Sequence, residues 1–457
     1  MNTAMERTER PEADRPLVMK FGGTSVGSAQ RMKDVAVLAR VNAQNGVLVV
    51  VSAMSGVTDS LFRAARLAFE GNLEAANAVC EDLRAKHYET HRELSPRTET
   101  ADEFAYIDEI IDALKERLHG VALLRELSPR SMDAIASSGE LLSGQLVARA
   151  IGCRYIDARP LMKTDSRFGE ARPDMEAIKA AVNEHVAPLM RPWEIVVTQG
   201  YIGSDQENAT TTLGRGGSDF SASIFGAALG AREIQIWTDV EGILTCDPRI
   251  VPNAKTVEVL GYFEAAELAA FGAKVLHPAT VKPALDAGIP VTVRNTMKPE
   301  GKYSTIKPGK SSGRPVVALA MRKNVTIISI KQEDMTDQYG FLAKLFKVFG
   351  DAEVSVDLIS TSEISVSISL DSSSPLPKLK KELQKLGAVD VLSGRVVIAV
   401  VGDLLKRTPA VLNKVFTVLE QIEVDLVSLG ANSVNLSFIV KQEDAEFAMK
   451  KLHEVFF

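Results

Sequence analysis

The chain has few cysteines, and their spacing excludes two kinds of site. Only Cys80, Cys153 and Cys246 occur in 457 residues, and no two of them form a CxxC pair. Thiols this sparse and distant exclude a disulfide framework and a cysteine-based zinc site. They are typical of a protein kept reduced inside the cell, so we expect a cytoplasmic location.

The chain also lacks the features of a membrane protein or a nucleic-acid binder. It has no stretch of the roughly 18 apolar residues that a membrane-spanning helix needs. The first fifteen residues mix acidic and basic side chains and have no apolar centre, unlike a signal peptide. The formal net charge is −6, whereas binding to a phosphate backbone favours a basic surface. We therefore expect neither a membrane nor a nucleic acid as partner.

Two common nucleotide-binding fingerprints are missing as well. The sequence has no GxxxxGK[ST] and no GxGxxG after a strand. Both motifs use glycines to bring backbone N–H groups to phosphates, so P-loop and Rossmann readings lack their main support. A composition of 46% hydrophobic and 25% charged residues still provides a large core. The length suggests about three domains.

What the chain does have is a glycine pair placed directly after a hydrophobic strand. The apolar run 16–19 leads into Lys20, Gly22 and Gly23. A strand that ends at glycines before a helix exposes N–H groups that favour an anion, and Lys20 adds a point charge. A Gly-Gly turn alone also occurs in proteins without a ligand. A second glycine segment at 214–219, GRGGSD, gives it weight.

Up to about residue 306, strand and helix patterns alternate along the chain. Continuous apolar strands separated by helices indicate a largely parallel sheet covered on both faces, with ligands at the carboxyl ends of its strands. Glycine, proline, serine and lysine dominate residues 298–315, which predicts a linker or an exposed hairpin. The predicted strands are 46–53, 194–199, 233–238 and 289–293, and the predicted helices are 131–150 (broken at Gly139 and Gly144), 218–229 and 262–271.

The last third of the chain contains an internal repeat. The string VDLIS at 356–360 returns as VDLVS at 424–428. A predicted amphipathic helix precedes each string, at 341–349 and 410–419. An alternating strand follows each string, at 364–370 and 434–440. We therefore predict two small α+β units of the same design.

Several polar residues beside the glycine segments are candidates for ligand binding. Arg215, between glycines, has the fork geometry that grips a carboxylate, although a solvated turn arginine is the simpler alternative. Ser218 and Asp219 suit a helix N-cap. Glu140 could pair with a ligand ammonium group, or could be an acid favoured by a helix N-terminus. Ser52 and Thr58 offer hydroxyls to a ligand or to a turn.

Other candidates lie farther along the chain. Thr238 and Asp239 follow a predicted strand and could hold a nucleoside, and Lys274 could neutralise phosphate charge. A plain turn and a solvated lysine are the alternatives. His87 and His91 have the i,i+4 spacing of some metal sites, but they stand in a charged stretch without a third ligand. We predict a solvated helix face for them.

Six motifs, in order, resemble the aspartate kinase family. They are KFGGTSV (20–26), SSGE (137–140), TTTLGRGGSD (210–219), WTDVEGI (237–243), DPR (247–249) and GAKVLHP (272–278). The resemblance implies a three-layer α/β amino acid kinase fold over 16–306 with a mainly parallel sheet. It also implies two α+β, ferredoxin-like ACT domains at 322–392 and 394–457, which could be interleaved. Residues 340–363 are most similar to the lysine-inhibited, single-function class.

The resemblance also implies residue roles. Lys20, Gly22, Gly23 and Lys274 would contact ATP phosphates, and Thr238, Asp239 and Arg249 would line the nucleoside site. The aspartate and catalytic site would contain Ser52, Thr58, Glu140, Tyr201, Arg215 and Ser218, with Asp219 as an orienting residue. An effector pocket would contain Met335, Gly340, Phe341, Leu342, Val356, Asp357, Ser362 and Glu363. Leu244 and Gln338 depart from the family pattern, in which tyrosine is frequent near the adenine and serine stands at the second position in a lysine-sensitive type.

The function implied by the resemblance is transfer of phosphate from ATP, with Mg²⁺, to the side-chain carboxylate of L-aspartate. The product, 4-phospho-L-aspartate, begins lysine, threonine and methionine biosynthesis. Feedback by an amino acid, lysine first, and a homodimer or homotetramer formed through the ACT domains are expected. The alternatives are a kinase of the same fold that acts on glutamate or N-acetylglutamate, and a non-catalytic amino-acid sensor.

Overall fold

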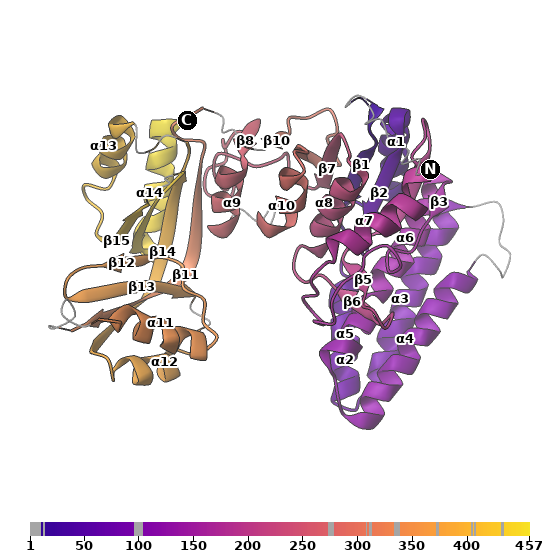
Figure 1. Cartoon of the computed structure of the whole chain (residues 1–457), viewed down its shortest axis with the longest axis horizontal. Coiled ribbons are helices and arrows are strands. Elements are labelled where there is room, and N and C mark those ends of the chain that lie inside the picture. The colour runs from indigo at the N-terminus through magenta and orange to yellow at the C-terminus, as the bar shows by residue number, and fades with distance from the viewer. Residues whose placement is uncertain are drawn as a thin grey trace, which may run out of the picture. The chain divides into compact units, whose positions relative to one another are not determined.

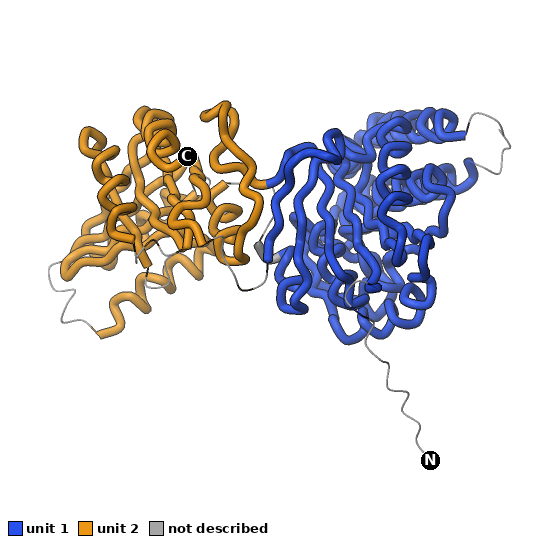
Figure 2. Tube along the Cα trace, turned by 90° about the horizontal axis from the view of Figure 1, so that it is seen from above, with its two compact units in different colours: residues 1–242, 276–308 blue, residues 243–275, 309–457 orange. Residues whose placement is uncertain are grey.

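The chain folds into two compact units, which Figure 2 distinguishes by colour. The computed structural model describes residues 11, 14–95, 104–272, 278–307, 309, 313–332, 339–371, 374–403, 405, 408–430 and 434–457. Unit 1 comprises residues 1–242 and 276–308, and unit 2 comprises 243–275 and 309–457. Residues 243–275 thus cluster with unit 2, although the sequence analysis places them in the kinase domain. The domain boundaries themselves stay predictions.

Unit 1 is built on a mainly parallel sheet. Its strand order is β3-β4-β2-β1-β7-β9-β10. Every residue of β1, β2 and β4 is buried, which explains their unbroken apolar runs. The strands are β1 (Leu17–Phe21), β2 (Val47–Val51), β3 (Arg154–Tyr155), β4 (Ile195–Gln199), β7 (Glu233–Thr238), β9 (Val291–Asn295) and β10 (Ser304–Lys307).

The prediction for residues 298–315 is largely confirmed. Strand β10 runs antiparallel to β9, so a hairpin is present, and most of the described residues of the segment are exposed. The exceptions are Ser304 and Ile306, which are fully buried. The turn-forming composition of the segment concealed a short strand of the main sheet.

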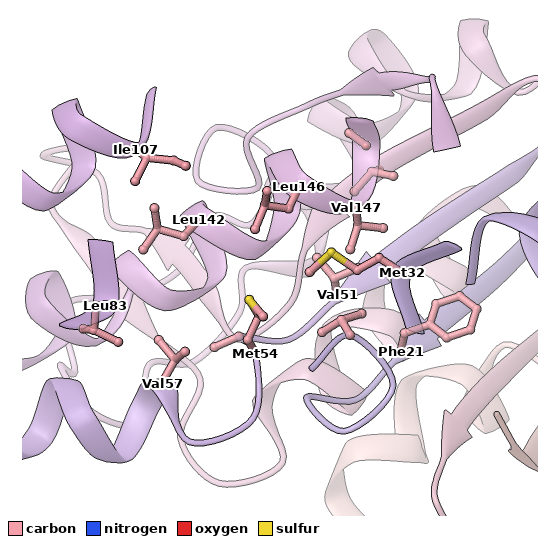
Figure 3. Packing of buried hydrophobic residues seen from close by; sticks show 14 of the residues in the cluster. Phe21, Met32, Val51, Met54, Val57, Leu83, Ile107, Leu142, Leu146 and Val147 are labelled. Carbon is pink, nitrogen blue, oxygen red and sulfur yellow. The ribbon is translucent and has the colours of Figure 1, made fainter. Parts of the chain in front are cut away.

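Helices cover both faces of this sheet. On one face, Leu17, Met19 and Phe21 share a core with α1 (Ala29–Val41), α2 (Val57–Phe69), α3 (Leu73–Leu94), α4 (Ala105–Leu124) and α6 (Ser138–Ile151). Figure 3 shows part of that core, with Phe21 and Val51 from the sheet near Met32 and Val147 from the helices. On the other face lie α7 (Met175–His185), α8 (Gly217–Leu229) and α10 (Pro278–Asp286), and α8 contacts both of the others. Val18 and Lys20 alternate with the core residues and therefore face α8.

The helical region 131–150 breaks at a different place from the one predicted. Helices α5 (Pro129–Ala136) and α6 meet at Ser137, and both predicted breakers lie inside α6. A Cβ atom on Gly139 would lie 2.8 Å from the Cβ of Ala53, and one on Gly144 would lie 2.9 Å from Tyr155. These glycines therefore allow close packing instead of ending the helix.

The histidine prediction is wrong. His87 and His91 are both buried in α3, at 0% and 1% exposure, instead of facing solvent. The His87 ring bonds the carbonyl of Leu83 through Nδ1, at 2.6 Å, and burial lowers its pKa to about 4. The sequence around the two histidines is polar and therefore predicted exposure. In the structure α3 packs against α4, and Tyr106 of α4 stacks on His91.

Unit 2 contains the predicted repeat, built around two long strands. Its sheet has the order β12-β13-β11-β14-β16-β15. Helices α11 and α12 lie side by side, as do α13 and α14 (Figure 1). The strands are β11 (Ala318–Lys331), β12 (Ile359–Thr361), β13 (Ser365–Asp371), β14 (Ala388–Val401), β15 (Val424–Leu429) and β16 (Asn435–Lys441). The helices are α11 (Phe341–Asp351), α12 (Leu376–Leu383), α13 (Pro409–Val418) and α14 (Gln442–Phe456).

The two repeats have separate cores but share these long strands. The first core takes Ile328 and Ile330 from β11, and the second takes Leu319 from β11 together with Ile398 and Val400 from β14. Each long strand thus packs into the core of one repeat at one end and into the core of the other repeat at its other end. Unit 2 also contains β8 (Val259–Gly261) and α9 (Tyr262–Ala270), and Glu267 of α9 accepts a hydrogen bond from Asn435 at 2.7 Å. Shorter 3-10 turns in unit 1 span Ala43–Asn45 and Ala187–Leu189.

Candidate active site

Unit 1 contains a cavity of about 600 Å³ beside the carboxyl ends of β1 and β2. Both glycine segments reach it, although almost 200 residues separate them in sequence. The strand ends bring the first segment there, and the start of α8 brings the second. Its lining is Lys20, Gly23, Ser52, Ala53, Met54, Ser55, Gly56, Thr58, Asp59, Phe62, Glu140, Tyr201 and residues 214–219.

Two helices begin at this cavity without a side-chain cap. Helix α2 starts after Gly56 and α8 starts after Gly216, both in the left-handed region, with φ of 79° and 73°. The sequence analysis proposed Ser218 and Asp219 as caps of α8, but both lie inside its first turn. Uncapped N-termini present backbone N–H groups and the positive end of the helix dipole. The cavity therefore favours anions at two places.

The predicted lysine and aspartate form an ion pair at the cavity wall. Lys20 Nζ lies 2.6 Å from Asp219 Oδ1, and both side chains are largely withdrawn from water. The pair follows from strand alternation, because Lys20 points to the α8 face and Asp219 stands in the first turn of α8. A lysine so placed can exchange its carboxylate partner for a ligand phosphate.

Glu140 is the most deeply buried acid of the cavity. It is 3% exposed, and its Oε1 accepts one hydrogen bond, from the Ala53 N–H at 3.2 Å. Its Oε2 is buried without a hydrogen-bond partner among the described residues. Burial raises the pKa of Glu140 to about 8, against the smaller effect of the Ala53 N–H. Such a carboxyl is suited to a cationic ligand group.

Tyr201 and Arg215 lie on neighbouring segments that are held rigidly. Strands β5 (Ile202–Ser204) and β6 (Thr210–Thr212) form the hairpin between them. Tyr201 has a φ of 68°, which is rare outside glycine. Its N–H donates to Ser221 Oγ at 2.9 Å, and its carbonyl accepts from the Leu213 N–H at 2.9 Å. A guanidinium so close to an uncapped helix N-terminus suits bidentate binding of a carboxylate.

The two glycines of the first segment behave differently. The Gly22 N–H donates to the carbonyl of Trp237 at 3.2 Å, so it is already used within the sheet. We therefore drop the expectation that this amide binds phosphate. Gly23 lines the cavity, and a Cβ there would lie 2.7 Å from the carbonyl oxygen of Ala53. Only glycine permits this approach of two backbones.

Among the remaining nucleotide candidates, Thr238, Asp239 and Arg249 do not line the cavity. Thr238 ends β7, the neighbour of β1, and Asp239 follows it, with its carbonyl accepting a hydrogen bond from the Asn295 side chain at 3.3 Å. Arg249 belongs to unit 2 and pairs with Asp247, with its side chain 82% exposed. Lys274 lies outside the described residues. The nucleoside role of these residues stays a prediction.

The cavity also contains residues that the sequence analysis missed. Ser55, Asp59 and Phe62 line it in addition to the predicted Ser52 and Thr58. Asp59 and Phe62 are three residues apart in α2 and so share one face of that helix, whereas Ser55 precedes the helix. The i,i+3 spacing after Gly56 could have identified Asp59 and Phe62.

The predicted effector residues lie in the first repeat of unit 2. Gly340 starts α11 in the left-handed region with φ of 79°, and Phe341 is buried in the core while Leu342 is 44% exposed. Asp357 pairs with Arg322 on β11.

The other predicted effector residues lie nearby in sequence. Val356 packs against the first core, and Glu363 is exposed. The hydroxyls of Ser362 and Ser365 are hydrogen-bonded at 2.8 Å. Met335 and Gln338 lie outside the described residues. The role of these residues in binding an effector stays a prediction.

The described residues contain no group of three or more histidine, cysteine or acidic side chains that could hold a metal ion. Among the described helices, none is both long and apolar enough to cross a membrane.

Comparison with known families matches most of the chain to two models. The model of the amino acid kinase family matches residues 15–295, and an ACT domain model matches 328–374 and 398–456. Aspartokinase 2 of Arabidopsis thaliana, a chloroplastic protein, is 37% identical over 96% of this chain and 84% of its own length. The chain belongs to the aspartokinase family. The family predicted from the six motifs is thereby confirmed.

Other aspartokinases extend the similarity over both units. The lysine-sensitive aspartokinase 3 of Escherichia coli is 36% identical over 96% of this chain and 99% of its own. The structure of E. coli aspartokinase III with aspartate and ADP, described as the R-state, matches with a TM-score of 0.80 at 35% identity over 96% of this chain and 99% of that one. The structure of the same enzyme with lysine and aspartate, described as the T-state, matches with a TM-score of 0.78. The amino acid kinase fold with ACT domains is therefore confirmed, and the chain is a kinase.

Proposed function

We propose that the cavity of unit 1 binds L-aspartate beside the phosphates of ATP and transfers the γ-phosphate to the side-chain carboxylate. One observation carries this proposal. A deeply buried carboxyl group, Glu140, shares the cavity with Arg215, Lys20 and two uncapped helix N-termini. This charge pattern complements an amino acid with one ammonium group and two carboxylates. The relative solved with aspartate and ADP supports the same ligands.

The reaction requires positioning more than proton transfer. A side-chain carboxylate with a reference pKa near 4 is ionised at neutral pH, so no general base is needed. Arg215 would hold the α-carboxylate and Glu140 the ammonium group, with Ser52, Thr58, Tyr201 and Ser218 around them. The free carboxylate then faces the γ-phosphate, and its oxygen forms the new P–O bond as the bond to ADP breaks.

Lys20 is the group that would stabilise the charge on the transferring phosphoryl group. Its ammonium lies 2.6 Å from Asp219, which would keep it oriented for the phosphate. Gly23 would allow the phosphates to approach the backbone. Lys274, Thr238, Asp239 and Arg249 would complete the ATP site.

Magnesium would be held mainly by the phosphates of ATP. Mg²⁺ usually takes one or two protein carboxylates in addition to phosphate oxygens, and Asp219 and Asp59 are carboxylates of the cavity lining. The donor set therefore fits a nucleotide-bound ion. Its positive charge would add to that of Lys20.

Unit 2 would regulate this activity. An amino acid bound beside Gly340, Leu342 and Asp357 would bias the enzyme between two states, and the relative solved with lysine supports lysine as that effector. We further propose a homodimer or homotetramer formed through the ACT repeats. The three cysteines are free thiols, in keeping with the cytoplasmic location that we propose.

An assay of ADP release tests the proposed function. Aspartate, glutamate and N-acetylglutamate are supplied in turn with ATP and Mg²⁺. We expect release with aspartate alone, and inhibition by lysine when lysine, threonine and methionine are added singly. Arg215→Ala should raise the aspartate KM at least tenfold. The control Arg167→Ala removes an exposed arginine of the same unit that pairs with Asp165, and should change little. Turnover of another acid, or none at all, would reject the proposal.

A further inference from the structure

A buried acid outside the cavity lining holds the segments that carry Arg215 and Tyr201. Asp133 in α5 is 2% exposed and accepts three hydrogen bonds. The N–H groups of Gly169 and Thr212 both donate to its Oδ2 at 2.9 Å, and the Thr212 hydroxyl donates to Oδ1 at 2.8 Å. Three donors around one buried carboxylate form a fixed arrangement, because losing any acceptor leaves a donor unpaired.

The first connection runs from Asp133 to Tyr201. Thr212 ends β6 and pairs with Ile202, the residue after Tyr201, and the N–H of the next residue, Leu213, donates to the Tyr201 carbonyl at 2.9 Å. Tyr201 lines the cavity in a left-handed conformation. Such a conformation persists only where its surroundings determine it. A displacement of Asp133 would therefore displace Thr212 and, with it, Tyr201 in the cavity wall.

The second connection runs from Asp133 to the Arg215 loop. Gly169, held by Asp133, lies against Gly214. A Cβ on Gly214 would be 3.1 Å from the Gly169 carbonyl oxygen and 2.7 Å from Glu170. The Ala171 N–H donates to the Thr212 carbonyl at 2.9 Å, which joins the same two segments again. Asp133 thus holds Thr212, which precedes Arg215 in the chain, and Gly169, which packs against Gly214 just before Arg215.

From these two connections we infer that Asp133 is a positioning residue for the amino-acid substrate. It acts through Thr212 and Gly169 and sets the places of Tyr201 and Arg215 without touching the substrate. The inference rests on the proposed function, because it assigns Arg215 and Tyr201 to the amino-acid site. Lys20 and Gly23 on the phosphate side have no hydrogen bond to this network among the described residues.

The test compares Asp133→Asn with a matched control, Asp205→Asn. Asp205 is equally buried, at 2% exposure, and also accepts three hydrogen bonds, from Ser166, Glu207 and Ala209. It closes the β5–β6 turn and does not line the cavity. An asparagine at either site keeps the size, but with its oxygen on the two N–H groups its NH2 group faces a hydroxyl, that of Thr212 or Ser166, which loses its acceptor.

We expect Asp133→Asn to raise the aspartate KM at least tenfold while the ATP KM changes less than twofold. Asp205→Asn should leave both KM values within twofold at a comparable loss of Tm. Thr212→Val should give part of the effect, and Thr212→Ser should recover most of it. If Asp133→Asn does not fold, the threonine pair provides the comparison.

Two results would overturn the inference. One is equal KM changes in both asparagine variants, and the other is an Asp133→Asn defect confined to kcat or to ATP. Calorimetric binding of whichever amino acid the wild-type protein accepts repeats the comparison without phosphoryl transfer. A wild-type protein that binds its acid but transfers no phosphate therefore rejects the proposed function and still tests the positioning role.

Discussion

The cavity of unit 1 and the first repeat of unit 2 use the same local device with opposite electrostatics. In both, a left-handed glycine starts a helix that has no side-chain cap, Gly216 at α8 and Gly340 at α11. Near the first, Glu140 is buried and forms no ion pair with a described residue, although Lys20 and Arg215 line the same cavity. In the second, Asp357 is half-buried and already paired with Arg322. A ligand ammonium group would complete the charge balance at Glu140, whereas at Asp357 it would have to compete with a guanidinium.

This difference would let the proposed substrate site and the proposed effector site respond differently to an amino acid. Burial raises the pKa of Glu140 and makes its ionised form depend on a ligand cation. Asp357, by contrast, already has a cationic partner in Arg322. Five experiments test this comparison.

The largest effect is expected at Lys20. Lys20→Met should lower kcat by about 100- to 1,000-fold, because removing one preformed charge donor costs about 3–4 kcal/mol of transition-state stabilisation. The aspartate KM should change less than threefold. Steady-state kinetics with both substrates provide the measurement, and circular dichroism controls for folding, since Asp219 loses its partner. Near-full turnover would exclude Lys20 from the chemistry.

The next effect concerns pH and Glu140. The ammonium group of aspartate needs the ionised carboxyl, so the aspartate KM should rise by up to about tenfold per pH unit as pH falls below about 8. Glu140→Gln should raise the aspartate KM throughout and remove this pH dependence. Kinetics between pH 6 and 9 decide, and a steep profile that survives in the glutamine variant would refute the assignment.

The same shift predicts a gain in stability. A carboxyl whose pKa is raised by folding contributes full stability below its unfolded value of 4.5, and this contribution is lost as pH rises to about 8. Above pH 8 the ligand-free protein then holds an unfavourable charge. Glu140→Gln should therefore raise the Tm at pH 8.5 and leave it nearly unchanged at pH 4.5. Thermal unfolding at the two pH values provides the measurement.

A pair of glycine variants tests the packing behind the cavity. Gly139→Ala should destabilise the protein by about 1–3 kcal/mol, because the new Cβ would lie 2.8 Å from Ala53. Gly120→Ala, in α4 with nothing within 4 Å, should instead stabilise by about 0.5–1 kcal/mol. Urea unfolding measures both. Equal effects would contradict the close approach of α6 to the cavity wall.

The smallest effect compares the two aspartates of the repeat. Asp357 pairs with Arg322, and Asp425 pairs with Arg395 at 2.6 Å, with side-chain exposures of 24% and 9%. Asp425→Asn should cost more stability than Asp357→Asn, which should cost at most about 1 kcal/mol. Only Asp357→Asn should weaken inhibition by lysine, with kcat unchanged. Urea unfolding and lysine titrations provide the data, and loss of inhibition in both variants would remove the distinction.

Much of the fold could be predicted from the sequence because its signals are local. Unbroken valine-rich runs indicated buried parallel strands, and the VDL strings indicated the two repeats. The failures share one cause. The local sequence around Gly139, His87 and Ile306 is ordinary. Gly139 nevertheless lies inside a helix, His87 in a core and Ile306 in a sheet, because of the segments packed against them.

For the site, the sequence by itself determined which residue types are present: glycines before helices, Lys20, Glu140 and Arg215, in motifs typical of one family. Tertiary structure decided which of them meet. In the structure the Gly22 N–H donates to the Trp237 carbonyl, α8 begins after Gly216, and Asp133 accepts a hydrogen bond from the Thr212 N–H. The physical reason is that hydrogen bonding and burial depend on partners distant in sequence, whereas turn and strand preferences depend on neighbours in the chain.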